Sequence, residues 1–190
     1  MPSAMTTVEE LTQLGKQLEN QELESPGGVA TPQIYGQLLT IYLVQNDLNN
    51  AKYLWKRIPA AVKSANPELG NIWTIGQKMW QKDFAGIYEA INKDWSDNLK
   101  PTMATLLEST RRRVFNLVAQ AYSSVSGDQF AQMMGMTVEE AVQAAVSQDW
   151  KADAQTRLVI PVRSAPQSET SVPSEQMLER LTDFVSFLEN

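Results

Sequence analysis

Apolar residues recur every three or four positions along most of this chain, which places them on one face of successive α-helices. Several of these stretches follow a helix start signal, such as Thr31-Pro32 or Asn66-Pro67. An amphipathic helix has to cover its apolar face against another element. The chain is therefore predicted to be mainly α. The predicted stripes are Val8, Leu11, Leu14 and Leu18; Tyr35, Leu38, Leu39 and Tyr42; Leu48, Ala51, Leu54, Trp55 and Ile58; Leu69, Ile72, Trp73, Gly76, Met79 and Trp80; Phe84, Ile87 and Ile91; Met103, Leu107, Val114, Leu117 and Ala121; and Val138, Val142, Ala145, Val146 and Trp150.

A short internal repeat accompanies the first helices. Gln45-Asn46-Asp47-Leu48 is echoed by Gln81-Lys82-Asp83-Phe84, an offset of about 36 residues. This is close to the roughly 34-residue period of TPR-like helix-turn-helix repeats. Each copy stands between two amphipathic stretches. Residues 1–125 are therefore predicted to form a helical-repeat region.

A different order of elements follows. One long helix is expected over about 98–124, and then a short helix that stops at Gly135. Thr137 to Glu140 is a capping box that starts another helix. A turn near residue 153 and the β-prone run at 157–160 complete the pattern. This order predicts a winged-helix subdomain at 126–162 that shares the long helix, with its first strand at 123–126.

The chain ends with a predicted linker and a last helix. Residues 163–174 are rich in proline and serine and carry no periodic apolar residues, which is typical of a flexible linker. A helix of about 15 residues is marginal alone in water, so the helix at 175–190 should pack on its own domain or on other chains. Its apolar face consists of Met177, Leu178, Leu181, Phe184, Val185 and Leu188.

The absence of cysteine and histidine excludes a disulfide, a thiol nucleophile, a histidine base and an ordinary zinc site. The carboxylate pairs Glu9-Glu10 and Glu139-Glu140 fall in first helical turns, where they favour the helix dipole. No glycine-rich phosphate loop is present, since Gly27-Gly28 follows no strand. We therefore expect no catalytic residue, cofactor or metal, and no enzyme. No apolar run approaches the roughly 20 residues of a membrane span, and we expect no secretory signal.

Charge argues against nucleic acid as the ligand. The net charge is −6, and residues 137–150 contain no Lys or Arg. A winged helix that reads DNA places this helix in the major groove, where Glu139, Glu140 and Asp149 would repel phosphates. A module that binds proteins is favoured, with a nucleic-acid binder as the alternative from a different class.

The basic clusters have a structural interpretation. Arg111, Arg112 and Arg113 spread over about 200° of a helix, so we expect a solvated face with one or two ion pairs, with a partner contact as the alternative. Trp55 falls on an apolar stripe while Lys56 and Arg57 fall off it. We therefore expect a core tryptophan with a solvated basic edge. Trp73 and Trp80 lie seven residues apart on one stripe and are expected in the core as well.

Four long runs resemble a known family. These are ENQELESPGGVATPQIYGQLL, NDLNNAKYLWKRIPAAVKSANPELGNIW, STRRRVFNLVAQAY and ERLTDFVSFLEN. They resemble the smallest, eighth-subunit family of the COP-nine signalosome, which belongs to the PCI group. The resemblance implies helical repeats followed by a winged helix. It also implies a non-catalytic scaffold in a complex that removes the ubiquitin-like modifier NEDD-eight from cullins and so regulates cullin-RING ubiquitin ligases. The runner-up is the equivalent PCI subunit of the proteasome lid.

The resemblance also implies partners and places. In such complexes winged helices meet edge to edge, C-terminal helices form a common bundle, and a different subunit holds the zinc metalloprotease site. The partners would be other signalosome subunits, in cytoplasm and nucleus, with no small molecule or membrane. Edge pairing is mapped to Leu158, Val159 and Ile160. The bundle contact is mapped to Met177, Leu178, Leu181, Phe184, Val185 and Leu188.

Overall fold

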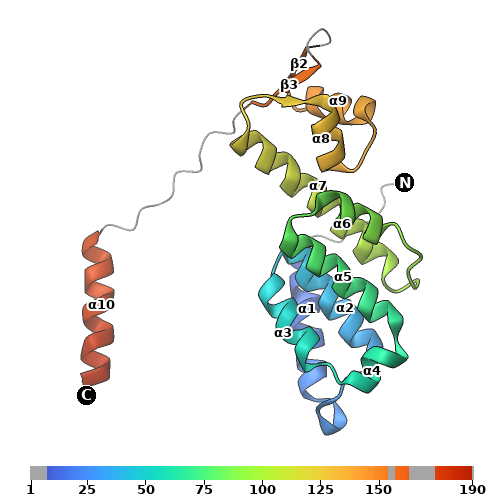
Figure 1. Ribbon diagram of the computed structural model, residues 1–190. Helices are drawn as coiled ribbons and strands as arrows, with labels where there is room; N and C mark the ends of the chain where they lie inside the picture. Colours follow the sequence, from blue (N-terminus) through green and yellow to red (C-terminus); the bar gives the residue numbers. More distant parts are fainter. Residues whose placement is uncertain (1–7, 154–156, 163–173, 190) are drawn as a thin grey trace.

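Helices make up most of the chain (Figure 1). The structure, a computed structural model, describes residues 8–153, 157–162 and 174–189, without the side chains of residues 8, 9, 174–177, 180, 188 and 189. The sequence from Thr7 to Glu10 has the pattern of a capping box, but Thr7 lies outside this description, as does the predicted linker except Ser174. The elements are α1 (Val8–Leu23), the 3-10 helix η1 (Pro26–Gly28), α2 (Pro32–Gln45), α3 (Leu48–Arg57), α4 (Ala60–Ala65), α5 (Pro67–Gln81), α6 (Phe84–Ile91), α7 (Lys100–Ala121), β1 (Val125–Ser126), α8 (Gly127–Met134), α9 (Val138–Val146), β2 (Lys151–Asp153), β3 (Leu158–Ile160) and α10 (Ser174–Glu189).

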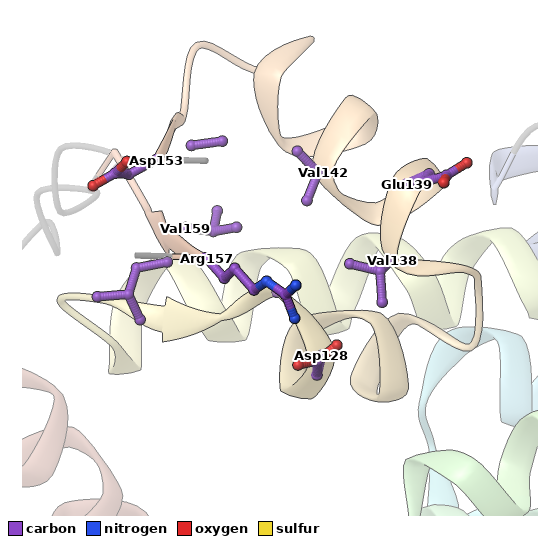
Figure 2. A pocket seen from close by; sticks show the side chains of 10 residues that line it. Asp128, Val138, Glu139, Val142, Asp153, Arg157 and Val159 are labelled. Carbon is purple, nitrogen blue, oxygen red and sulfur yellow. The ribbon is translucent and has the colours of Figure 1, made fainter. Parts of the chain in front are cut away.

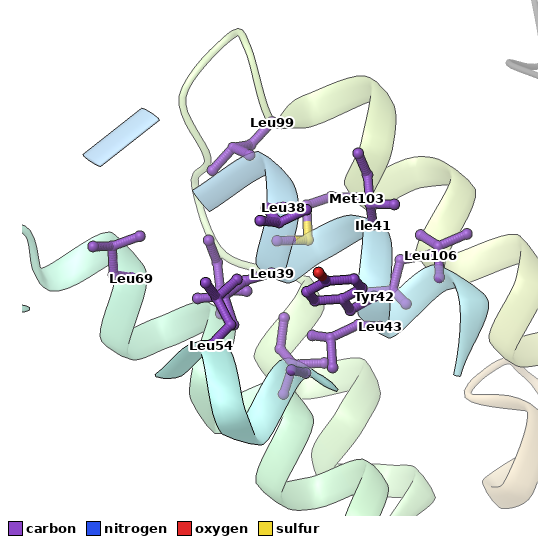
Figure 3. Packing of buried hydrophobic residues seen from close by; sticks show 14 of the residues in the cluster. Leu38, Leu39, Ile41, Tyr42, Leu43, Leu54, Leu69, Leu99, Met103 and Leu106 are labelled. Atoms are coloured by element: carbon purple, nitrogen blue, oxygen red, sulfur yellow. The ribbon is translucent and has the colours of Figure 1, made fainter. Parts of the chain in front are cut away.

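Helix α2 is the centre of the first hydrophobic core and packs against α1, α3, α5 and α7. Its start is fixed as predicted: the Thr31 side chain accepts a hydrogen bond from the Ile34 N–H, and Pro32 occupies the first turn. Because α2 has neighbours on all sides, it is buried well beyond the predicted stripe. Figure 3 shows its apolar side chains meeting those of α3, α5 and α7.

The internal repeat in the sequence corresponds to a repeated turn in the structure. Asn46 and Lys82 both adopt the left-handed conformation, with φ of 62° and 60°, and end α2 and α5. The next residue starts the following helix in each copy. Asp47 accepts from the Asn50 N–H and Asp83 from the Gly86 N–H, each at 3.0 Å. The two echoes are therefore the same joint between two helices.

Helix α7 joins the first core to a second one. Leu106 belongs to the first cluster, whereas Val114 and Val118 belong to the second, which is formed with α8, α9 and a small sheet. The sheet is antiparallel in the order β1-β3-β2. The capping box predicted at Thr137 is present, with reciprocal bonds to Glu140. The mainly α prediction with a winged-helix module is thus confirmed.

Several predicted stripes were wrong in detail. Residues 60–65 form a helix that the sequence did not predict, and α7 is shorter than the predicted 98–124. Ala145 of α9 and Trp150 beyond its end are buried as predicted, but Ala141 is buried where Val138 and Val146 were expected, because small side chains let α9 approach α8 closely. The residues predicted to be buried that are exposed are Leu14, Trp80, Leu117, Ala121, Val138 and Val146.

The basic edge of α3 was predicted only in part. Trp55 is half-buried against the first core and stacks on Trp73, with ring centroids 5.6 Å apart. Lys56 is exposed as expected. The Arg57 guanidinium, however, donates two 2.7 Å hydrogen bonds to the carboxylate of Glu22, whose side chain is 8% exposed. Arg57 therefore ties α3 to α1.

Candidate functional site

A cavity of about 560 Å³ lies between the helices of the winged-helix module and the β2–β3 hairpin (Figure 2). Val138 and Val142 of α9 line it from one side, and Leu158 lines it from the hairpin. In Figure 2 the Arg157 side chain extends towards Asp128. The cavity is therefore an apolar depression with a charged rim. The residues that line it are Gly127, Asp128, Val138, Glu139, Val142, Ala152, Asp153, Arg157, Leu158 and Val159.

The rim has the wrong charge for a nucleic acid. It carries three carboxylates, those of Asp128, Glu139 and Asp153, and one guanidinium, that of Arg157. Helix α9 contributes no Lys or Arg. A phosphate backbone approaching this side would meet more negative than positive charge, which opposes binding.

The residues predicted for edge pairing do not lie on an edge strand of the sheet. Strand β3 holds Leu158, Val159 and Ile160, but it is the central strand, hydrogen-bonded to β1 on one side and β2 on the other. Val159 is 1% exposed and belongs to the second core, so it has no surface to offer a partner. Leu158 and Ile160 are 36% and 43% exposed. The sequence could not order the strands, because all three are only two or three residues long.

The C-terminal helix α10 exposes its apolar residues. Leu178, Leu181, Phe184 and Val185 are between 52% and 67% exposed, and Figure 1 shows α10 apart from the other helices. Met177 and Leu188 lie outside the described side chains. Phe187, which the predicted face left out, is 79% exposed. The described part of the apolar face predicted from spacing is thus uncovered in the single chain.

The arginine cluster does not form the predicted solvated face. Arg112 is exposed, but Arg113 donates to the Ser109 carbonyl oxygen at 3.2 Å and to the Leu43 carbonyl oxygen at 3.4 Å. Burial and the charge of Arg112 lower the pKa of the Arg113 guanidinium. Arg111 donates to the Gly135 carbonyl oxygen. None of the three forms an ion pair within the described part of the chain, so Arg111 and Arg113 serve to join the two cores.

Among the described residues, no group of three or more His, Cys, Asp or Glu could hold a metal ion. The raised pKa of Tyr42 comes from burial and from the hydrogen bond that its hydroxyl donates to Glu19 at 2.6 Å. This bond joins α2 to α1 in the repeat region. No described helix is both long enough and apolar enough to cross a membrane.

Helical repeats joined through one long helix to a small winged helix define a PCI-type module. Residues 29–170, about three quarters of the chain, match the model of the family described as the CSN8/PSMD8/EIF3K family. The chain belongs to this family.

Curated relatives resolve the family further. The chain is 54% identical to COP9 signalosome complex subunit 8 of Danio rerio over 191 residues, which covers 100% of both chains. It is 38% identical to the protein of that name from Arabidopsis thaliana, covering 78% of this chain and 76% of the relative. The corresponding Drosophila melanogaster protein is 30% identical, with 92% and 94% covered.

Proposed function

We propose that this chain is a non-catalytic subunit of the COP9 signalosome that holds sister subunits together. The Danio rerio relative is named as a subunit of this complex, and its similarity to this chain extends over the full length of both proteins. This supports the same role for this chain. The removal of NEDD-eight from cullins, and with it the regulation of cullin-RING ligases, would be the work of the assembled complex. We expect that complex in both cytoplasm and nucleus.

The observation that carries this proposal is the uncovered apolar face of α10. Its described residues Leu178, Leu181, Phe184 and Val185 are each more than half exposed. Complete burial of a side chain of this kind contributes about 1.5–3 kcal/mol. Burial of their exposed parts against a partner would favour association by on the order of 5 kcal/mol, before the entropy cost of ordering the helix is subtracted. A helix with this much uncovered apolar surface is suited to a bundle with helices of other subunits.

The winged helix offers a second contact. The strands at the edges of its sheet are β1 and β2, so pairing with a neighbouring sheet would use one of these. Strand β2 is exposed along its whole length, whereas Val125 of β1 is buried. We therefore assign edge pairing to Lys151–Asp153, with Leu158 and Ile160 supplying apolar side chains beside it.

Removal of residues 175–190 tests the role of α10. The tagged full chain and the truncated chain are expressed in cells, and the co-purified proteins are identified and quantified. The full chain should recover the signalosome subunits, and the truncated chain should recover far fewer of them with an unchanged circular dichroism spectrum of the remaining helices. Normal incorporation of the truncated chain would contradict the proposal. Recovery of proteasome lid subunits by the full chain would favour the runner-up.

A matched pair of substitutions separates the apolar face from general disruption of the helix. Leu181→Asp places a charge at the centre of the predicted face. Phe187→Asp places the same charge about 120° away around the helix. We expect Leu181→Asp to reduce incorporation strongly and Phe187→Asp to have a small effect. Equal losses would show that the predicted face is not the contact.

A further inference from the structure

The segment from α3 to α5 is basic in an otherwise acidic chain. Residues 51–82 hold six of the 16 Lys and Arg residues and one of the 22 Asp and Glu residues, Glu68. This gives the segment a net charge of +5 in a chain whose net charge is −6. A region of opposite charge to the rest of the molecule steers partners of complementary charge towards it.

Two of these cations are neutralised within the fold. Arg57 pairs with Glu22 and Lys78 with Asp83, each at 2.7 Å. The remaining four form no ion pair with any residue that the structure describes. They are Lys52, Lys56, Lys63 and Lys82.

Two of the unpaired lysines flank a row of tryptophans. Trp55 stacks on Trp73, and the Lys63 ammonium lies 4.7 Å from the centre of the Trp55 ring. At the other end the Lys52 ammonium lies 5.0 Å from the centre of the Trp80 ring. We name this set, Lys63, Trp55, Trp73, Trp80 and Lys52, the Trp–Lys strip.

A small cavity lies within the strip. It measures about 200 Å³ and is lined by residues of α5 and α3. These are Trp73, Gly76, Gln77, Trp80 and Gln81 of α5, and Leu48 and Lys52 of α3. Trp80 is 54% exposed although it belongs to an otherwise buried stripe. A cavity whose lining includes two aromatic rings and one cation can hold one apolar side chain beside one carboxylate.

We propose that the Trp–Lys strip is a docking surface for a segment of a sister subunit that carries an apolar side chain flanked by aspartate or glutamate. The apolar side chain occupies the cavity between Trp73 and Trp80, and the carboxylates bind Lys52 and Lys63. Each ammonium has three N–H donors, and its place over a ring leaves donors for a carboxylate. This inference rests on the proposed function, because it takes the partner to be a subunit of the same complex.

Two other occupants fit the strip less well. Single-stranded nucleic acid needs open ring faces on which bases stack. Here Lys63 and Trp73 both pack against Trp55, and Lys52 lies over Trp80. The chain's own α10 is acidic and apolar, but Glu179 and Asp183 are each two positions from Leu181. They lie about 160° around the helix from it, so the apolar face of α10 centred on Leu181 does not carry these two carboxylates.

Zero-length carbodiimide cross-linking of the assembled complex tests this proposal, because it joins only amines and carboxylates already in contact. Mass spectrometry should find Lys52 or Lys63 joined to an Asp or Glu of a sister subunit. Both lysines should also react less with an amine reagent in the complex than in the free chain. Equal reactivity of both lysines in the two states, with no such cross-link, would overturn the proposal.

Charge reversal gives the second readout. Lys52→Glu with Lys63→Glu should reduce incorporation about tenfold or more, and Lys52→Arg with Lys63→Arg should retain it. The matched control reverses two exposed lysines elsewhere, Lys16 and Lys93, and should leave incorporation unchanged. Circular dichroism and thermal melting verify that every variant is folded.

The outcomes separate this proposal from the proposed function. Normal incorporation of the reversed variant alongside the normal full chain would overturn the strip alone. Failure of the unaltered chain to assemble would overturn both. Binding of a single-stranded oligouridylate that the double reversal abolishes would overturn the peptide docking in favour of nucleic acid.

Discussion

Substitution of Gly135 by alanine should destabilise the protein far more than an ordinary glycine substitution. Gly135 ends α8 with a φ of +62°. A Cβ atom placed there would lie 2.2 Å from the Cδ2 atom of Tyr88 and 2.3 Å from its Cγ atom. The Tyr88 ring is buried, and its hydroxyl donates to the Met133 carbonyl oxygen at 3.0 Å. Burial also raises the pKa of Tyr88 to about 12. The ring therefore cannot move aside without losing this contact between α6 and α8.

The expected magnitude has three contributions. The left-handed conformation costs an alanine about 1–2 kcal/mol. Overpacking of a buried site costs about 1–3 kcal/mol, and loss of the Tyr88 hydrogen bond about 1 kcal/mol. The free energy of unfolding should thus fall by about 3–6 kcal/mol. Gly28 is the control, since its φ is +71° but nothing lies within 4 Å of a Cβ atom there. Gly28→Ala should cost only the conformational part, about 1–2 kcal/mol.

Urea unfolding followed by tryptophan fluorescence measures both variants. A double-mutant cycle with Tyr88→Ala then isolates the steric overlap. In the Tyr88→Ala background, Gly135→Ala should cost about as much as Gly28→Ala does in the unaltered chain. The reasoning is refuted if the two glycine variants have equal stability, or if the cost of Gly135→Ala is the same with and without the tyrosine ring.

Two further predictions concern charge. Glu22→Gln should lower the free energy of unfolding by about 2 kcal/mol, because it removes a nearly buried carboxylate from its two bonds with Arg57. As a control, Asp97→Asn removes the solvent-exposed ion pair with Lys100 and should leave the urea midpoint of unfolding unchanged. Equal losses of stability in Glu22→Gln and Asp97→Asn would contradict the prediction. Acid should also destabilise the fold. The pKa values of Asp83 and Glu140 are held below their usual range, in Asp83 first by a lysine ammonium and in Glu140 first by a backbone N–H. A lowered folded-state pKa contributes stability above the unfolded-state value, near 4, that is lost as pH falls through the folded-state value. The urea midpoint of unfolding should therefore decrease as the pH is lowered below about 4. The double variant Asp83→Asn with Glu140→Gln should show a smaller decrease over the same pH range. An equal decrease in the variant and the unaltered chain would refute this prediction.

The helix ends were predictable because local chemistry determines them. Thr31 with Pro32, Thr137 with Glu140, and Gly135 act within one turn of the chain, and each does in the structure what its spacing predicted. The helix starts at Asp47 and Asp83 are local in the same way, since each aspartate accepts a hydrogen bond from a backbone N–H three residues later.

The buried faces were harder to predict because they depend on distant neighbours. Helix α7 leaves one core after Leu106 and enters another at Val114, so a single periodic stripe misplaces Leu117. Trp80 has the spacing of a core residue, but it faces the strip between α3 and α5 instead. The strand order placed β3 in the centre of the sheet, which spacing alone does not determine.

The passage of one helix through both cores has a mechanical consequence. A straight helix resists bending, because bending stretches its backbone hydrogen bonds. A force on the winged helix is therefore transmitted to the repeats through α7, which Arg113 near its middle ties to Leu43 of α2. The angle between the helical repeats and the winged helix is therefore set when the chain folds. Neighbouring subunits in a large complex would have to fit this angle.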